Sequence, residues 1–292
     1  MKNPLHTDYA DTDDRELVRR SLDGDRSALD RLIKRHQPFI YNVAWKMTHD
    51  PHDALDLTQD TLLKVITKLS QFNFKSAFRT WLYRIVFNEF LQGKRRNRED
   101  QFVSFEAYGA QLDQVPNPDL TREEEIEQAE LSREMRFRCM SGMLMCLSRE
   151  QRLIYILGDS FGVQHRLGAE LLAISPANFR VKLHRARKDL YSYMNNKCGL
   201  INKANPCRCP KKAKALKAMG ALDERHQIFN ISYKNKIADY VADQIETATD
   251  TFDERYTALY REHPTKEDFD KQTVIDKVLG DGKLMKFFDD QL

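Results

Sequence analysis

Aromatic and cationic side chains alternate in one short segment of the sequence. Between Phe72 and Arg84 lie five aromatic residues and three cations. Aromatic rings stack on unpaired bases while cations follow the phosphate backbone, so this composition is typical of a surface that holds single-stranded nucleic acid. The spacing of Phe78 also fits the apolar stripe of a helix, and a place in the core is expected for that ring. The candidate contact residues are Phe72, Asn73, Phe74, Lys75, Arg79, Trp81, Arg84 and Asn88.

A second basic segment follows a helix-start signal. Ser175 places a capping hydroxyl before Pro176, and proline is favoured at the first position of a helix. Phe179, Leu183 and Ala186 share one face of the predicted helix. The polar residues at its start and on its outward face are candidates for contacts with bases and phosphates: Ser175, Asn178, Arg180, Lys182, His184, Arg185 and Arg187. A capping box at 148–151 starts an earlier helix, and closely spaced helices that end in a basic one predict a helix-turn-helix.

Cysteine is the third residue type that could do chemistry. The five cysteines are an odd number for a disulfide framework, which favours a reducing cytoplasm. Cys198, Cys207 and Cys209 supply three soft ligands, which suit a zinc ion if His226 or another group completes the set. The alternative is three small cysteines that are free or partly buried. Cys139 and Cys146, seven residues apart on a predicted helix, are expected in the core.

Charge is segregated along the chain, although the net charge is only +3. Residues 79–98 and 197–217 are strongly basic, whereas residues 99–130 carry ten acids and one base. Alternating blocks of this kind suit a protein that meets nucleic acid at separated places. No phosphate-binding glycine loop or hydrolase motif is present, so no catalytic residue is assigned and the chain is not expected to be an enzyme. We expect no membrane-spanning helix and no secretory signal.

The elements that carry these residues are predicted to be helices. Apolar residues recur at helical spacing over 27–48, where Pro38 is expected to kink or interrupt the helix, and over 54–69. A third helix is expected to start with Ser76 as its N-cap. Residues 99–117 show no sustained period and are interpreted as an extended acidic linker, after which helical periodicity returns over 120–194. The predicted class is all-α.

The sequence resembles a bacterial RNA polymerase sigma factor of the extracytoplasmic function (ECF) group. The resemblance rests on two blocks in the correct order: GDRSALDRLIKRH, DALDLTQDTLLKV and FRTWLYRIVFNEF, then LSREQR and ISPANFRVKLHRARKDL. It implies two helical domains, region 2 over 14–98 and a region 4 helix-turn-helix over 131–195. The acidic linker of 99–130 joins them, and a helical extension of 196–292 follows.

The resemblance also implies the partners. Region 2 would bind the β′ clamp helices of core RNA polymerase through Asp53, Asp56, Gln59 and Asp60. Residues 72–77 would capture a flipped base of the minus-ten promoter element, and the helix that follows would melt the duplex. The basic helix at 176–188 would read the minus-thirty-five element, and region 4 would touch the β flap. The linker would occupy the path of nascent RNA. Ala173, where the family usually has glycine, and Gly168, where it usually has isoleucine, depart from the helix-turn-helix pattern.

The extension after residue 195 lies outside the core family pattern, although CGLINKANPCRCPKK is similar to a tail motif in a subset of these factors. We expect residues 196–292 to form a small helical module that tunes activity or adds stability. No cofactor is required, and an anti-sigma factor is a candidate partner. Two alternatives stay open. One is a helix-turn-helix regulator that is not a sigma subunit, and the other is a metal-responsive or ligand-responsive sensor.

Overall fold

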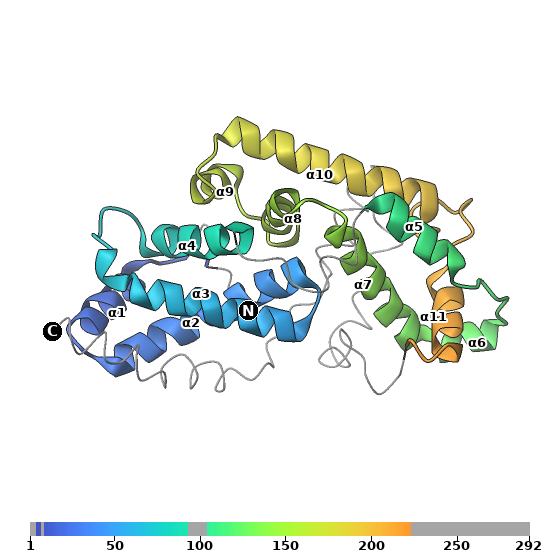
Figure 1. Ribbon diagram of the computed structural model, residues 1–292, viewed down its shortest axis with the longest axis horizontal. Coiled ribbons are helices and arrows are strands. Elements are labelled where there is room, and N and C mark those ends of the chain that lie inside the picture. Colours follow the sequence, from blue (N-terminus) through green and yellow to red (C-terminus); the bar gives the residue numbers. More distant parts are fainter. Residues whose placement is uncertain (1–3, 7–8, 93–103, 223–292) are drawn as a thin grey trace. The chain divides into compact units, whose positions relative to one another are not determined.

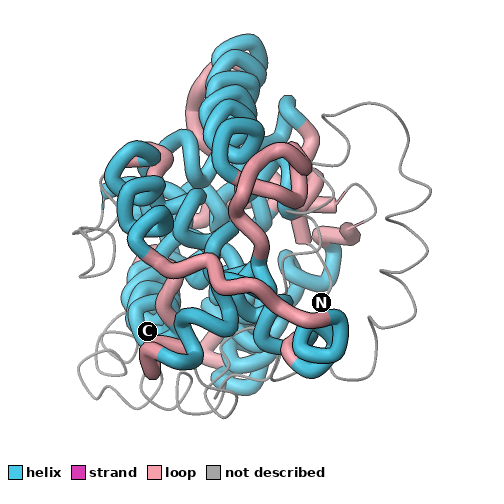
Figure 2. Tube along the Cα trace, turned by 90° about the vertical axis from the view of Figure 1, so that its right-hand side faces the viewer, coloured by secondary structure: helices cyan, strands magenta, loops and turns pink. Residues whose placement is uncertain are grey.

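A computed structural model describes residues 4–6, 9–92 and 104–222 of the chain. Within these ranges every regular element is a helix (Figure 1), and one isolated β-bridge joins Cys198 and Cys207. The tube in Figure 2 likewise shows helices and loops in the described residues and no strand. The all-α prediction is confirmed. Outside the described residues lie the basic run at 94–98, His226 and residues 223–292 of the predicted helical extension.

The described residues belong to two compact units. The first takes its residues from 1–98 and 149–183, and the second from 99–148 and 184–264. The first unit begins with the helices α1 (Thr12–Leu22), α2 (Arg26–Thr48), α3 (Pro51–Thr67), the 3₁₀ turn η1 (Leu69–Gln71) and α4 (Phe78–Gln92). Each unit is described by itself below.

Short local signals start the helices of this first unit. The Asp25 carboxylate accepts a hydrogen bond from the Ala28 amide at 3.0 Å and caps α2. Asp50 caps α3 in the same way, accepting from the amides of His52 and Asp53 at 2.8 and 3.1 Å. Such caps stabilise a helix because they give its first amides a hydrogen-bond acceptor. Both predicted helices are therefore present, with α3 starting three residues earlier than expected.

Pro38 lies inside α2 and does not interrupt it, which was one of the two outcomes expected from the sequence. Proline cannot donate a backbone hydrogen bond, and its ring crowds the preceding turn. Burial offsets this cost, because nearly every residue of α2 after Gln37 is buried. Tertiary packing over the whole length of the helix thus prevails over the local preference.

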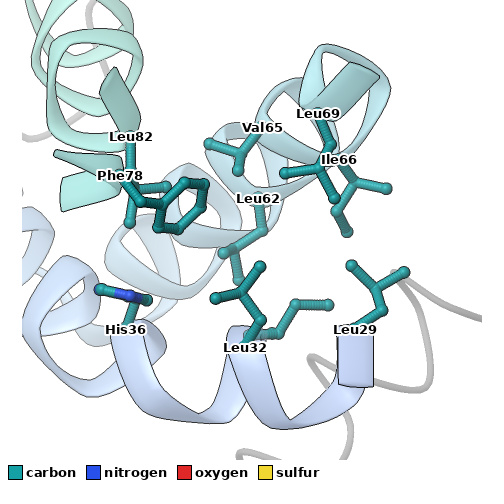
Figure 3. Close-up of a pocket in the computed structure, with 10 residues that line it drawn as sticks. Leu29, Leu32, His36, Leu62, Val65, Ile66, Leu69, Phe78 and Leu82 are labelled. Atoms are coloured by element: carbon teal, nitrogen blue, oxygen red, sulfur yellow. The ribbon is translucent and has the colours of Figure 1, made fainter. Parts of the chain in front are cut away.

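The core of this part of the first unit lies between α2, α3 and α4. Figure 3 shows the side chains of Leu32, Leu62 and Phe78 pointing toward one another from these three helices. They line a cavity of about 20 Å³, together with Leu29, Ile33, His36, Val65, Ile66, Leu69 and Leu82. A space of this size could hold about one water molecule and is too small for a ligand. The core therefore serves as a packed scaffold for the surfaces of α3 and α4.

The first unit also contains the predicted helix-turn-helix. Its elements are α8 (Arg149–Tyr155), a π-helical turn at Ile156–Ser160, α9 (His165–Leu171) and the first part of α10 (Pro176–Lys197). Both predicted helix starts are confirmed. Helix α8 begins directly after Ser148, and the Asn178 amide donates to the Ser175 hydroxyl at 3.1 Å at the start of α10.

The second unit is built from α5 (Phe105–Gln114), α6 (Arg122–Glu127), α7 (Ala129–Met145), α11 (Cys209–Ala218) and the last part of α10. Its buried apolar cluster comprises Leu112, Leu131, Met135, Ala213 and Leu222. Cys139 and Cys207 pack against this cluster, as expected for Cys139. The core thus joins residues from the acidic linker, from α7 and from the tail.

Helix α5 falls within 99–117, where the sequence suggested an extended segment. Ser104 starts it by accepting a hydrogen bond from the Ala107 amide at 3.1 Å. Leu112 is buried in the cluster, and Gly109 lies so close to Tyr193 that an added Cβ would be 3.3 Å from the ring. The short helix is stabilised by these tertiary contacts, because a ten-residue peptide with this weak period would not be helical alone.

Candidate nucleic-acid interface

The segment between η1 and α4, residues 72–77, is called the capture loop below. Phe72 is only 3% exposed and packs edge-on against Phe78, with 5.3 Å between ring centroids. Phe74 is half-buried, whereas Asn73 and Lys75 are exposed. The structure therefore places Phe72 in the core beside Phe78, and the capture loop presents Asn73, Lys75 and part of Phe74 to solvent.

The start of α4 differs from the sequence prediction. Ser76 does not cap the helix, because its hydroxyl contacts the Ala77 carbonyl instead. The carboxylate of Asp11 accepts hydrogen bonds from the amides of Phe78 at 2.9 Å and Arg79 at 3.2 Å. The N-terminal amides of a helix have no partner within the helix, and an acidic group there also meets the positive end of the helix dipole. The cap of α4 thus comes from a residue 67 positions away.

The other candidates on α4 lie along its outer side. Arg84 and Asn88 are exposed, and Trp81 is half-buried against Phe72 and Phe78. The guanidinium of Arg79 donates to the carbonyls of Pro4 and His6 at 3.2 and 2.9 Å. Arg84 donates to the carbonyl of Glu170 at 3.2 Å. The two arginines therefore have protein partners in this structure, which nucleic acid would have to replace.

The acidic residues of α3 are exposed on one side of the helix. Asp56 and Asp60 are exposed, and Asp53 and Gln59 are partly so, while the apolar residues of α3 face the core. Residues three or four positions apart on a helix are neighbours. The four residues 53, 56, 59 and 60 thus form a continuous polar strip, which we call the α3 strip.

The turn between α9 and α10 is tight. Ala173 adopts a left-handed conformation with φ of 54°, which glycine would adopt without strain. The Ile174 amide closes the turn by donating to the Ala169 carbonyl at 3.0 Å. Gly168 explains the second departure from the family pattern, because a Cβ there would lie 2.6 Å from the ring of Phe179. Because Gly168 of α9 has no side chain, the ring of Phe179 in α10 can pack closely against it.

Helix α10 presents a basic face, as predicted. Phe179, Leu183 and Ala186 are buried. Outside, Arg180, His184 and Arg185 are exposed, Lys182 and Arg187 are partly exposed, and Ser175 and Asn178 are exposed at the helix start. The Lys182 ammonium forms an ion pair with Glu150 of α8. The arrangement offers cationic and hydrogen-bonding groups on one helix face, as direct readout of a DNA groove requires.

The acidic linker and the basic tail segment meet in the second unit. Lys211 pairs with Asp119 and Lys214 with Glu124, each at 2.6 Å. These contacts hold the pKa of both carboxyl groups below the ordinary value. Exposed ion pairs of this kind are screened by solvent and add little to stability. They give two of the seven bases at 197–217 partners within the protein, which the charge pattern alone had not indicated.

The three cysteines of the tail, Cys198, Cys207 and Cys209, precede Lys211 and Lys214 in the sequence. The β-bridge joins Cys198 to Cys207, and burial raises the pKa of the Cys209 thiol to about 12. Cys198, Cys207 and Cys209 are each partly buried free thiols. In the part of the chain that the structure describes, no three His, Cys, Asp or Glu residues are arranged to hold a metal ion. The predicted zinc site therefore gains no support from the described residues.

Sequence reasoning did not identify three residues that touch the capture loop or the start of α4. Asp11 caps the following helix, Arg15 contacts the loop backbone, and the Arg19 guanidinium lies 5.3 Å from the centre of the Phe74 ring. Asp11 is the residue before α1, Arg15 lies in the first half of the helix and Arg19 in its last turn, at a spacing of four residues. That spacing places them on one face of a helix, but the sequence does not indicate which surface this face contacts.

Comparisons with known proteins agree with this architecture. Residues 32–99 match the family Sigma-70 region 2. The ECF RNA polymerase sigma factor SigE of Mycolicibacterium smegmatis is 28% identical over 59% of this chain and 64% of its own length. The RNA polymerase sigma factor YlaC of Bacillus subtilis is 29% identical over 58% of this chain and 93% of its own. The RNA polymerase sigma-H factor of Pseudomonas aeruginosa is 39% identical over 75 residues.

The relatives and the region 2 match agree with the fold described above. That match covers the α3 strip, the capture loop and α4, which are the surfaces that the sequence had singled out. No described helix is long and apolar enough to cross a membrane. A Sigma-70 region 2 is thus present at residues 32–99, and about 60% of the chain is similar to RNA polymerase sigma factors of several bacteria, ECF factors among them.

Proposed function

We propose that this chain binds core RNA polymerase, recognises promoter DNA and opens it, so that transcription starts at a defined set of promoters. The observation that carries the proposal is the match to Sigma-70 region 2, because its 68 residues include both the α3 strip and the capture loop. Sigma factors are non-catalytic subunits of RNA polymerase and generally need no cofactor. The proposed function accordingly rests on binding surfaces alone, and a factor of this kind works in the cytoplasm.

The α3 strip is proposed to bind the β′ clamp helices. Asp56 and Asp60 are exposed, and the apolar side of the same helix is fixed in the core. A rigid acidic strip can be complementary to a basic partner surface, and complementary charge speeds association and selects the partner. Reversal of the charge at Asp60 should therefore weaken assembly with core polymerase, whereas reversal at the equally exposed Asp23 should not.

The capture loop is proposed to hold an unpaired base of the minus-ten element. Asn73 offers hydrogen-bonding groups, Phe74 a partly exposed ring, and Lys75 a charge for the phosphate backbone. Phe72 supports the loop from within the core. Arg79, Trp81, Arg84 and Asn88 on α4 would then contact the opened strands. For Arg79 and Arg84 this requires release of their present contacts with backbone carbonyls.

The basic face of α10 is proposed to read the minus-thirty-five element, with region 4 touching the β flap. Support comes from the exposed Arg180, His184 and Arg185, and from the tight turn that orients α10 on α9. The glycine at 168 and the left-handed Ala173 together preserve the helix-turn-helix despite the unusual sequence. The DNA-binding helix is therefore held at both its start and its inner face.

The linker and tail are proposed to act together. The acidic linker would follow the path of nascent RNA, where its negative charge imitates RNA. The tail would control how easily the linker enters that path. The ion pairs between α11 and residues 119 and 124 support a tail that holds the linker. A zinc ion on Cys198, Cys207 and Cys209 stays a prediction that metal analysis of the purified protein can test, as does binding of an anti-sigma factor.

One experiment separates the proposed function from the alternatives. Purified protein is added to core polymerase that lacks any other sigma factor, with genomic fragments of the source bacterium as template. A sigma factor yields transcripts from discrete start sites. A helix-turn-helix regulator binds DNA but yields none, and a metal-responsive sensor yields none at any metal concentration. Transcripts that depend on the protein would support the proposal, and their absence would contradict it.

A further inference from the structure

The N-terminal end of α1 holds the backbone of the capture loop. From a single nitrogen, Nη2, the Arg15 guanidinium donates hydrogen bonds to the carbonyl oxygens of Phe74 at 2.9 Å and Ser76 at 2.8 Å. These two carbonyls flank Lys75. Hydrogen bonds from a charged donor are stronger than those between neutral groups. The exposed part of the loop is thus fastened on both sides of one of its proposed contact residues.

A second residue fastens the end of the loop that enters α4. The Asp11 carboxylate caps the first two amides of α4 and also lies 3.4 Å from the Nε atom of Arg15. Asp11 and Arg15 are four residues apart, so the same face of one helix end carries both groups. The pair therefore connects the loop backbone to the start of the helix that follows it.

The conformation held in this way is one that the loop would not adopt alone. Phe74 has a φ of 60°, in the left-handed region that a bulky side chain disfavours. Such backbone conformations persist where the surrounding structure enforces them, and they often accompany function. The Phe74 ring is also fixed, because it packs on Phe72 at 4.7 Å and against the guanidinium of Arg19 at 5.3 Å.

We propose that Asp11, Arg15 and Arg19 are positioning residues that preorganise the capture loop for an unpaired promoter base. The inference rests on the proposed function of the loop. None of the three needs to touch the base. They hold Asn73, Phe74 and Lys75 in the orientation that receives it, so the loop does not have to be ordered when the base arrives. Preorganisation of this kind increases affinity and, for a base-specific contact, selectivity.

The test uses holoenzyme assembled from the full chain and core polymerase. The probe is a promoter fragment selected by this holoenzyme, premelted over the minus-ten element, with either the preferred base or a substitute at the captured position. The readout is the ratio of affinities for the two bases. Arg15→Ala should lower the affinity for the preferred base about 5- to 30-fold, because residues of the loop must then be ordered on binding. Arg15→Ala should also bring the ratio of the affinities for the preferred and the substitute base toward one.

Two further variants make the result decisive. Arg15→Lys keeps the charge but not the planar guanidinium, and should lie between wild type and Arg15→Ala. Arg20→Ala removes another arginine of α1, which pairs with Asp25 away from the loop, and should keep the wild-type ratio. A purely structural role for Arg15 would lower thermal stability without changing the ratio. If Arg15→Ala fails to assemble, the ratio measured for Arg15→Lys decides.

The outcome also distinguishes this inference from the proposed function. If Asn73→Ala abolishes the base preference while Arg15→Ala and Arg15→Lys retain it, the loop captures a base and the positioning role is wrong. If neither Asn73→Ala nor the Arg15 variants change the preference, base capture by the loop is itself wrong. Loss of preference in both Asn73→Ala and Arg15→Ala, with Arg20→Ala unchanged, supports both.

Discussion

The ammonium group of Lys212 in α11 lies at the C-terminal end of α5, where it donates a hydrogen bond to the Leu112 carbonyl at 2.9 Å. It also bonds to the carbonyl of Val115, and the Lys212 side chain is buried. The last carbonyls of a helix have no partner within the helix, and a cation there complements the negative end of the dipole. The tail thus supplies the C-terminal cap of a helix in the acidic linker.

Lys212→Met should therefore loosen α5. The substitution keeps the apolar stem but leaves two carbonyls without the ammonium group, at a cost of about 1–3 kcal/mol. Amide hydrogen exchange over residues 105–114, followed by mass spectrometry, should become faster. Lys217→Met on the exposed side of α11 is the matched control and should leave the exchange unchanged. Equal exchange in both variants would mean that Lys212 does not hold the linker.

Ala173→Gly should stabilise the helix-turn-helix. The left-handed backbone at Ala173 costs roughly 1–2 kcal/mol for a residue with a Cβ, and glycine avoids this cost while losing more chain entropy. A net gain of about 0.5–1 kcal/mol in the free energy of unfolding is expected from urea denaturation. Ala177→Gly, in the first turn of α10, should instead lose about as much. If both variants had a lower free energy of unfolding than wild type, the backbone at Ala173 would not be strained.

The basic face of α10 should separate into base and phosphate contacts. Arg180→Ala should weaken binding of holoenzyme to its preferred upstream element by about 1–3 kcal/mol and relax the sequence preference there. Arg185→Ala should weaken all sequences alike and make binding less sensitive to salt. Fluorescence anisotropy with variant promoter fragments at two salt concentrations measures both effects. Lys203→Ala, outside this helix, serves as the control.

Lys46 should make stability depend on pH. Its side chain is 4% exposed, and burial lowers its pKa to about 7, far below its value of roughly 10.4 in an unfolded chain. Between roughly pH 7 and 10 the unfolded chain binds more protons at this site, so the free energy of unfolding should rise with pH across that window. Below it, both states are protonated and the full penalty for the buried charge applies.

Lys46→Met removes this dependence. It should be more stable than wild type at pH 6–7, and the difference should shrink as the pH rises. Urea denaturation at one-unit steps from pH 6 to 9 measures the two profiles. Lys34→Met changes an exposed lysine of the same helix, and its profile should run parallel to wild type. A parallel profile for Lys46→Met as well would show that Lys46 does not titrate in this window.

Features that depend on nearby residues were predictable from the sequence. The start of α10 follows from Ser175 and Pro176, and the basic face follows from the positions of Phe179 and Leu183. Each of these signals acts within about one or two helical turns. The all-α class depends on the same short-range patterns, which is why it is confirmed by the structure.

Features that depend on distant partners were not predictable. Ser76 is a sound N-cap by its position, but Asp11 occupies the amides of α4 from another helix. Phe72 precedes the helix in sequence, yet its ring fills a space beside Phe78 and Trp81. Helix α5 has too weak a period to be recognised, because much of its stabilisation comes from Tyr193 and from α11. In each case a residue far along the chain decides the local structure.

The contact between Lys212 and Leu112 also determines when the second unit can fold during synthesis. The two residues are 100 positions apart, so the ribosome makes the cap of α5 long after α5 itself. At a synthesis rate of roughly 5–20 residues per second, the linker waits about 5–20 s for its partner. During that interval α5 lacks the tail contacts, and the exposed Leu112 is available to chaperones or to proteases. The second unit should therefore fold late, once Lys212 has emerged from the ribosome.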